Sequence, residues 1–253
     1  MTLIVAIGCT DGIVMGADSA STDASSGIKQ SSIKIEQIGS LPILCGGSGD
    51  VGLLQNIREN LETVRLAPKF KATRQHIKQL VVPEQRHAKD LHVPQNLPGG
   101  YHIPPVASLL LGCVQGGLPF ILEIEVDGRD TVFDKNLGLF GAIGSGKSLA
   151  QAIFRPHLHT PRDLNLGKIF AYRILDDAIE LASSGLARPI HLYTIDLSGK
   201  IEKIENGDLN KLGQDCELWR QLERDALGRF LAPEPPEEGP INVPEPEVEG
   251  GGS

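Results

Sequence analysis

The sequence has few of the residues that mark several common classes of protein. Aromatic residues make up 4% of its 253 residues, and no apolar run approaches the roughly 20 residues of a membrane-spanning helix. The N-terminus has neither the basic start nor the cleavage site of a signal peptide. The four cysteines, Cys9, Cys45, Cys113 and Cys216, lack the spacing of metal ligands. We therefore expect buried thiols in a reducing cytoplasm, no metal or other cofactor, and no membrane association.

The chain also lacks a surplus of basic residues. Its net charge is −8, but residues 233–253 hold six Glu and no Lys or Arg, so the remainder is close to neutral at −2. A protein that binds nucleic acid usually shows a basic face, so we expect no such partner. The same 21 residues include six Pro and almost no large apolar side chains. They cannot bury enough surface to offset the entropy of ordering, and we expect a disordered, solubilising tail.

Blocks of strand-like and helix-like sequence alternate along the rest of the chain. Residues 2–9 and 13–20 flank the turn Thr10-Asp11-Gly12 and predict a hairpin. Similar patterns predict paired strands over 31–39 and 41–47 and over 106–115 and 119–128, a strand in the apolar run before Gly141, and late strands over 190–199 and 200–205. Apolar spacing predicts helices over 50–66, 72–93 (broken or bent near Pro83), 148–158, 166–185 and 214–231. Hairpins followed by helices in this order favour two antiparallel sheets covered by helices, an α+β layered sandwich.

Residues 141–148, GAIGSGKS, match the phosphate-binding-loop pattern G-x-x-x-x-G-K-[ST] at every fixed position. Such a loop normally follows the first strand of a parallel sheet. Here about 140 residues of hairpins and helices come first, and few ordered residues follow. A nucleotide hydrolase is therefore the less favoured alternative.

Thr2 offers different chemistry. If Met1 is removed, Thr2 carries both a hydroxyl nucleophile and an α-amine, with a pKa of roughly 8, that can accept the hydroxyl proton. Hairpin counting places Asp18 beside Thr2. Lys34 lies in the next strand, where its charge would lower the pKa of the hydroxyl while Asp18 keeps the lysine charged and in place. The small residues of CGGSGD, 45–50, offer backbone N–H groups to an oxyanion.

Taken together, TLIVAIGCTDGIVMGADSAST (2–22), Lys34, CGGSGD and GAIGSGKS resemble the proteasome β subunits. Among N-terminal-nucleophile hydrolases, the chain resembles the bacterial proteasome-like members most, over residues 2 to about 205. The resemblance implies a four-layer αββα sandwich over residues 1–232, whose last helix spans about 214–231, followed by the tail 233–253. It also implies a threonine-type endopeptidase that cuts unfolded proteins or peptides inside a ring of identical subunits.

The resemblance assigns roles to individual residues. Thr2 falls on the nucleophile, Asp18 and Lys34 on the charged pair that supports it, and Gly46 on the oxyanion-hole residue, with Gly47 as the alternative. Further positions match serines near the threonine amine and the walls of the specificity pocket. The serines are Ser145 and Ser184, and the pocket residues are Ser21, Ser32, Leu44 and Ser48.

In this interpretation GSG of GAIGSGKS is the turn that delivers Ser145 to the active site, and Lys147 is an exposed helix-start lysine outside it. One position departs from the family pattern. Leu181 stands where the family often has Asp, and Glu180 lies one position earlier, about 100° around a helix. Proton handling near the threonine amine would then be weaker, or Glu180 would substitute for the Asp.

Two alternatives share this fold. One is an amidase that acts on a small substrate, because the same nucleophile serves both reactions. The other is a structural ring subunit without activity, which retention of Met1 would favour. The sequence does not reveal the ring size, an ATPase or other regulator, or the cleavage preference.

Overall fold

The computed structural model describes residues 2–22, 29–91, 106–134, 139–182 and 185–231. Its contacts group Met1–Cys216 as one compact unit and Glu217–Ser253 as a second. The boundary between these two groups falls inside the last helix, α5 (Asn206–Leu231). The tail predicted to be disordered lies outside the described residues. The first unit holds the candidate site.

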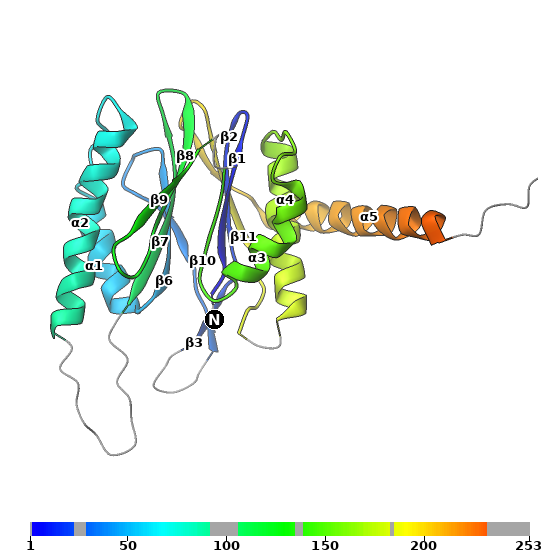
Figure 1. Cartoon of the computed structure of the whole chain (residues 1–253), viewed down its shortest axis with the longest axis horizontal. Coiled ribbons are helices and arrows are strands. Elements are labelled where there is room, and N and C mark those ends of the chain that lie inside the picture. Colours follow the sequence, from blue (N-terminus) through cyan, green and yellow to red (C-terminus); the bar gives the residue numbers. More distant parts are fainter. Residues whose placement is uncertain (1, 23–28, 92–105, 135–138, 183–184, 232–253) are drawn as a thin grey trace, which may run out of the picture. The chain divides into compact units, whose positions relative to one another are not determined.

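Two five-stranded antiparallel sheets lie at the centre of this unit (Figure 1). The first has the order β10 (Phe140–Ile143), β1 (Ile4–Cys9), β2 (Gly12–Ala17), β11 (His191–Asp196), β12 (Ile201–Lys203). The second has the order β5 (Ile35–Gln37), β6 (Ile43–Gly49), β7 (Ala107–Gln115), β8 (Leu118–Ile124), β9 (Asp130–Phe133). A short separate hairpin pairs β3 (Ala20–Thr22) with β4 (Lys29–Ser31).

The apolar side chains on the facing sides of the two sheets form a common core. Ile4 and Met15 of the first sheet belong to the same buried cluster as Leu44, Leu110 and Ile121 of the second. Alternation along a strand sends every second side chain into this layer. All residues of β1 and β2 are buried, because helices cover the other face of their sheet.

Helices form the two outer layers. In Figure 1, α1 (Val51–Leu61) and α2 (Phe70–Leu91) cover the second sheet, whereas α3 (Lys147–Phe154) and α4 (Leu164–Leu181) cover the first, and a short 3-10 turn, η1 (Arg155–His157), follows α3. Asp50 and Asp163 cap α1 and α4 by accepting hydrogen bonds from backbone N–H groups at 2.8 and 2.9 Å. The predicted four-layer αββα sandwich is confirmed. None of the helices in the described ranges combines the length and apolar character needed to cross a membrane.

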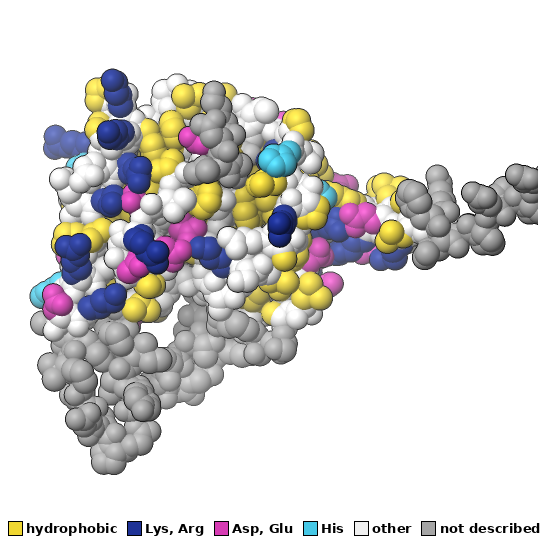
Figure 2. Space-filling model, viewed as in Figure 1, with side chains coloured by type: hydrophobic (Ala, Val, Ile, Leu, Met, Phe, Trp, Pro, Cys, Tyr) yellow, Lys and Arg dark blue, Asp and Glu magenta, His cyan; other side chains and the backbone are white. Residues whose placement is uncertain are grey.

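The second helix carries much of the basic charge that is visible on one face. Figure 2 shows Lys and Arg side chains gathered over α2. Two of them, Arg74 and Lys78, bind the buried carboxylate of Asp130 at the start of β9, at 2.5 and 2.8 Å. These ion pairs tie the helix to the edge strand of the second sheet.

Two helices differ from the sequence-based expectation. Helix α2 runs through Pro83 without a break. Pro83 cannot donate to the carbonyl of Gln79, but both residues are exposed, so water can bind that carbonyl. Helix α5 begins eight residues earlier than predicted and includes Gly213, where a Cβ would lie 3.0 Å from the hydroxyl oxygen of Tyr172. This glycine permits a close approach of α5 to α4 rather than ending the helix.

Candidate active site

The hairpin of β1 and β2 brings Asp18 to the residue that follows Thr2. Its register pairs Ile4 with Ala17, so Leu3 lies opposite Asp18. The backbone N–H of Leu3 donates to Asp18 Oδ1 at 2.8 Å, and the N–H of Ala20 donates to Oδ2 at 3.0 Å. Asp18 is fully buried, and these two donors fix its carboxylate at the start of β1.

Lys34 completes a buried ion pair at this position. Its Nζ lies 2.7 Å from Asp18 Oδ1, and its side chain is 6% exposed. Burial lowers the pKa of Lys34, and the hydrogen bond and charge of Asp18 oppose that effect. The lysine therefore gives up its proton more readily than a lysine in water, while Asp18 holds it in one place.

The turn between β10 and α3 contacts Thr2 from the other direction. The nitrogen of Thr2 donates to Ser145 Oγ at 3.2 Å, and the N–H of Gly146 donates to the carbonyl oxygen of Thr2, also at 3.2 Å. Gly144 has a φ of +93°, and a Cβ at this position would lie 2.1 Å from the Thr2 oxygen. Only glycine fits this position. The nitrogen of Thr2 is a peptide nitrogen while Met1 is attached and becomes the α-amine once Met1 is removed.

The same turn does not have the surroundings of a phosphate-binding loop. Strand β10 lies at the edge of an antiparallel sheet, and the N–H of Gly146 is already bonded to Thr2. Lys147, which would contact phosphates in such a loop, instead binds the carboxylates of Glu123 and Glu125, the latter at 2.8 Å. Lys147 is therefore partly buried and paired twice, rather than the exposed charge that we expected, because its side chain is only 30% exposed.

The strand register distinguishes the two candidate oxyanion-hole glycines. Hydrogen bonds from Val114 N to Pro42 O and from Asp50 N to Val106 O flank the paired segments of β6 and β7. Because hydrogen-bonded and non-hydrogen-bonded pairs alternate along an antiparallel ladder, Gly46 falls in a bonded pair with a β7 residue. The N–H of Gly47 points instead to the opposite edge, where it makes a long bond of 3.4 Å to the carbonyl of Lys34. The structure thus brings the N–H of Gly47, not that of Gly46, to the side on which Lys34 lies.

The predicted pocket residues lie in different environments. Leu44 is fully buried in the core between the sheets, so it does not line an open pocket as we expected. Its side chain alternates into the layer between the sheets, which the sequence pattern alone did not reveal. Ser48 is partly buried, and its Oγ would lie 3.3 Å from a Cβ on Gly144, beside the Thr2 carbonyl. The backbone N–H of Ser32 donates to Ser19 O at 2.9 Å. The side chain of Ser21 and all of Ser184 lie outside the described residues.

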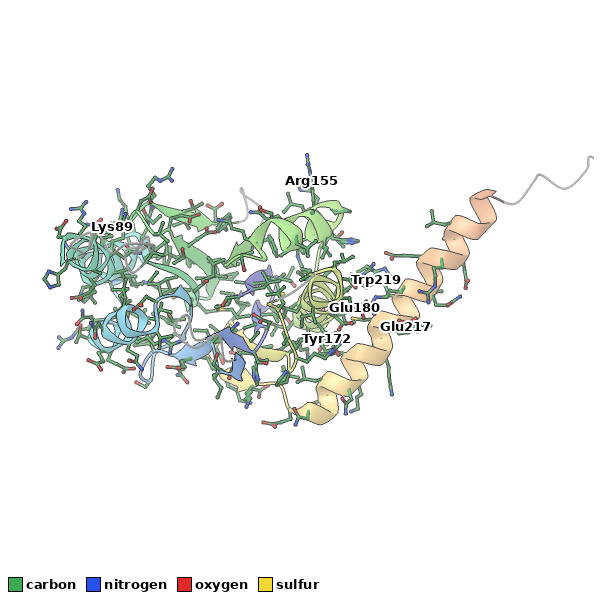
Figure 3. The ribbon with its side chains drawn as sticks, turned by 90° about the horizontal axis from the view of Figure 1, so that it is seen from below. Lys89, Arg155, Tyr172, Glu180, Glu217 and Trp219 are labelled. Carbon is green, nitrogen blue, oxygen red and sulfur yellow. The ribbon has the colours of Figure 1, made fainter. Side chains whose placement is uncertain are left out.

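Leu181, at the position where the family often has Asp, is the last residue of α4. Leu181 is 67% exposed. Glu180 and Tyr172 both belong to α4 (Figure 3), and Arg188 donates to the Tyr172 hydroxyl at 3.1 Å and pairs with Asp176. The hydrogen bond that Arg188 donates to Tyr172 is the largest cause that raises the pKa of Arg188, and the charge of Glu180 contributes to the same shift. The negative charge of Glu180 therefore favours the charged form of Arg188.

Three ionisable residues near the site were missed in the sequence. His191 pairs with Ala17 across β2 and β11. Burial lowers its pKa, the charges of Lys203 and Lys34 act in the same direction, and Asp18 opposes them. Glu123 and Glu125 alternate with apolar residues in ILEIE, so they share one face of β8 and its extension; that pattern was the available signal. No group of three or more His, Cys, Asp or Glu residues in the described part of the chain is arranged to hold a metal ion.

Two antiparallel five-stranded sheets between two layers of helices form the fold on which the comparisons with known proteins bear. The profile of the family described as "Proteasome subunit" matches residues 2–195, and the chain belongs to this family. It is similar in structure to Anbu (ancestral beta-subunit) from Yersinia bercovieri, with 13% identity, a TM-score of 0.71, and coverage of 92% of this chain and 100% of that one. It is also similar to the Anbu (Gly-1) mutant from Hyphomicrobium sp. strain MC1, with 16% identity, a TM-score of 0.68, and coverage of 91% and 99%. A search of curated proteins found no match.

Proposed function

We propose that this chain is a threonine-type endopeptidase that cuts unfolded proteins or peptides inside a cytoplasmic ring of identical subunits. Thr2 is the nucleophile after removal of Met1. The observation that carries the proposal is the buried Asp18–Lys34 pair at the start of β1, with Ser145 on the nitrogen of Thr2. Membership of the proteasome family supports the ring and the class of reaction.

The first half of the reaction forms an ester. Thr2 Oγ attacks the carbonyl carbon of a peptide bond while the neutral α-amine of Thr2 takes its proton. The positive charge of Lys34 stabilises the developing alkoxide, and the N–H of Gly47 turns from its long bond with the Lys34 carbonyl to the oxyanion. When the carbon–nitrogen bond breaks, the ammonium returns the proton to the leaving amine. The acyl group is then bound to Thr2.

The second half hydrolyses the ester. Water attacks the acyl carbon and gives a proton to the same amine, and Thr2 Oγ leaves and regains its proton as the product acid departs. Ser145 accepts a hydrogen bond from the Thr2 nitrogen, which orients the lone pair of the neutral amine. No group outside the chain is needed for proton balance.

Variants of the nucleophile test this mechanism. Thr2→Ala removes the only oxygen that can form the ester, so turnover of an unfolded protein substrate should fall to background while the melting temperature stays near that of the wild type. Thr2→Ser keeps the hydroxyl and should retain measurable turnover. Turnover by Thr2→Ala at the wild-type rate would exclude Thr2 as the nucleophile.

The assembly separates the proposal from its alternatives. A chamber requires a closed or nearly closed ring, so we expect a particle of several hundred kilodaltons by light scattering. A fully active monomer at micromolar concentration would favour the amidase that acts on small substrates. A ring that retains Met1 and has no turnover would favour a structural subunit.

A further inference from the structure

A cluster of three charged side chains lies beside the Ser145 turn. Lys147 is the first residue of α3, and its Nζ binds Glu123 in β8 and, at 2.8 Å, Oε1 of Glu125 just after that strand. Glu123 is 3% exposed and Glu125 is 38% exposed. In Figure 2, acidic and basic side chains lie next to one another in the middle of this face, between β9 and α3.

The cluster is joined to Thr2 through very few bonds. The residues on the N-terminal side of Lys147, Ser145 and Gly146, both hydrogen-bond to Thr2. The N–H of Lys147 in turn donates to the Gly144 carbonyl at 3.1 Å, which closes the turn. A shift of the lysine side chain would therefore move the atoms that contact the nucleophile.

One hollow connects the cluster to the site. It has a volume of about 260 Å³, and its lining includes Ser145 and Ser48 together with Lys147, Glu123 and Glu125. Water or a substrate group in this hollow can reach both the turn and the cluster. The N-cap residue of α3, Gly146, holds the turn through backbone bonds alone and makes no side-chain cap bond.

We infer that Lys147 is a positioning residue, which holds the Ser145 turn against the nitrogen of Thr2 through its ion pairs with Glu123 and Glu125. The effect of Lys147 on substrate turnover rests on the proposed function. Its effect on the position of the Ser145 turn rests on the geometry alone.

The charge states of the cluster make the inference sensitive to pH. Burial is the main cause that raises the pKa of Glu123 to about 7, a hydrogen bond with Glu125 adds to it, and Lys147 opposes it. Hydrogen bonds with Glu123 and Lys147 lower the pKa of Glu125, whereas the two carboxylates raise the pKa of Lys147 against the effect of burial. As pH falls through about 7, Glu123 is therefore the member that loses its charge.

The charged groups that act on Glu123 are its two partners in the cluster. The pKa of Glu123 responds to the charges of Glu125 and Lys147, and that of Glu125 also responds to Asp127, which pairs with Arg129. Ser108 and Ser145, which line the same hollow from β7 and from the turn, and Thr131, which pairs with Glu123 from β9, carry no charge.

Substitution of the lysine gives the main test. Lys147→Met should lower kcat by about ten-fold with KM changed less than about two-fold, because displacement of a catalytic group can cost up to about 100-fold. Lys147→Arg, which keeps the charge, should recover part of the loss. Lys78→Met is the matched control, because Lys78 is 29% exposed and binds Asp130, which keeps a second cation. The control should leave kcat within about two-fold.

The pH profile separates positioning from general stability. The ratio of the kcat of Glu123→Gln to that of the wild type should be about one-third at pH 8 and approach one at pH 6, where Glu123 is protonated in the wild type. Titration of the Thr2 amine is common to both proteins and cancels in the ratio. If Lys147→Met folds poorly, Lys147→Met/Glu123→Gln removes both charges from the buried position and should still show the loss of kcat. A ratio independent of pH would overturn the inference.

A measurement without turnover separates the inference from the proposed function. Amide hydrogen exchange at Gly146, whose N–H is bonded to Thr2, should be at least ten-fold faster in Lys147→Met and unchanged in Lys78→Met. Equal exchange in the two variants would overturn the inference even if the protein cleaves peptides. An inactive wild type with faster exchange in Lys147→Met would overturn the proposed function alone.

Discussion

Two lysines near Thr2 differ in how their charge is neutralised. Lys34 is paired with one carboxylate, that of Asp18, and burial lowers its pKa. Lys147 is paired with two carboxylates, which raise its pKa. In the proposed mechanism the first lysine can exchange a proton or stabilise a new negative charge near Thr2. The second is held too strongly for that chemistry.

The comparison shows why the same residue type can serve catalysis in one place and geometry in another. A buried cation with one carboxylate partner still exerts a positive electrostatic potential on a nearby reacting group. Two carboxylate partners cancel most of that potential. The sequence pattern made both lysines conspicuous, Lys34 in the strand after the hairpin and Lys147 in the glycine-rich turn. Only their partners distinguish the two roles.

The largest expected effect comes from removing the lysine with one partner. Lys34→Met should lower kcat by about 1,000-fold, within the range observed for lost proton-handling groups. It should also lower the free energy of unfolding by about 3 kcal/mol, because removal of one member of a buried pair leaves the other uncompensated. Activity assays and chemical denaturation measure the two effects.

A double variant separates the effect of Lys34→Met on kcat from its effect on the free energy of unfolding. Lys34→Met/Asp18→Asn should recover stability but not turnover. If Lys34→Met retained activity within ten-fold of the wild type, the catalytic role given to Lys34 would be wrong.

A smaller effect is expected from the hydroxyl that contacts the Thr2 nitrogen. Ser145→Ala should lower kcat by about ten-fold or more, the usual order for a proton-handling contact. Ser148, an exposed serine in the same helix start, is the matched control, and Ser148→Ala should have no measurable effect. In a phosphate-binding loop the order would be reversed, because the serine at position 148 would hold the magnesium ion.

The buried carboxyl partner of Lys147 should affect stability in a pH-dependent way. The pKa of Glu123 rises from 4.5 to about 7 on folding, so the native state binds more protons than the unfolded state between these values. The contribution of Glu123 to stability is therefore full below about pH 4.5 and is lost as pH rises to about 7. The melting temperature of Glu123→Gln relative to the wild type should be higher at pH 8 than at pH 5, by a few degrees. An opposite trend would mean that the ion pair with Lys147 outweighs burial.

The last prediction is that an added nucleotide has no effect on stability. Addition of ATP and magnesium should not shift the melting temperature, because a ligand stabilises a protein only if it binds the native state. Wild type and Lys147→Met are compared by thermal shift. A nucleotide-dependent rise that disappears in the variant would restore the phosphate-loop interpretation.

Local patterns predicted the parts of the site that depend on neighbouring residues in the sequence. The turn at Asp11-Gly12 fixes a two-strand register, and counting along it placed Asp18 beside the start of the chain. The layered α+β fold followed from the order of hairpins and helices. The chemistry of a threonine next to Met1 led to the role proposed for Thr2, and the resemblance to the proteasome family supplied Ser145.

The remaining features depend on contacts between distant elements. The alternation of hydrogen-bonded and non-hydrogen-bonded pairs between β6 and β7 decides that the N–H of Gly47, rather than that of Gly46, points toward Lys34. Neither the composition of the sequence nor the spacing of its residues reveals this alternation. The inward direction of Leu44 depends on the same register. The pairing of Lys147 with Glu123 joins residues 24 positions apart, one at the start of α3 and one in β8, so only the packing of these elements brings them together.

The mass of the mature protein, measured before and after treatment with a threonine-reactive inhibitor, tests the central claim most directly. The account predicts a mass that lacks Met1 and, after treatment, one inhibitor adduct that maps to Thr2 and is absent from Thr2→Ala. Met1 fully retained on a protein that still cleaves peptides would contradict it, because the α-amine required as the base would then be part of a peptide bond.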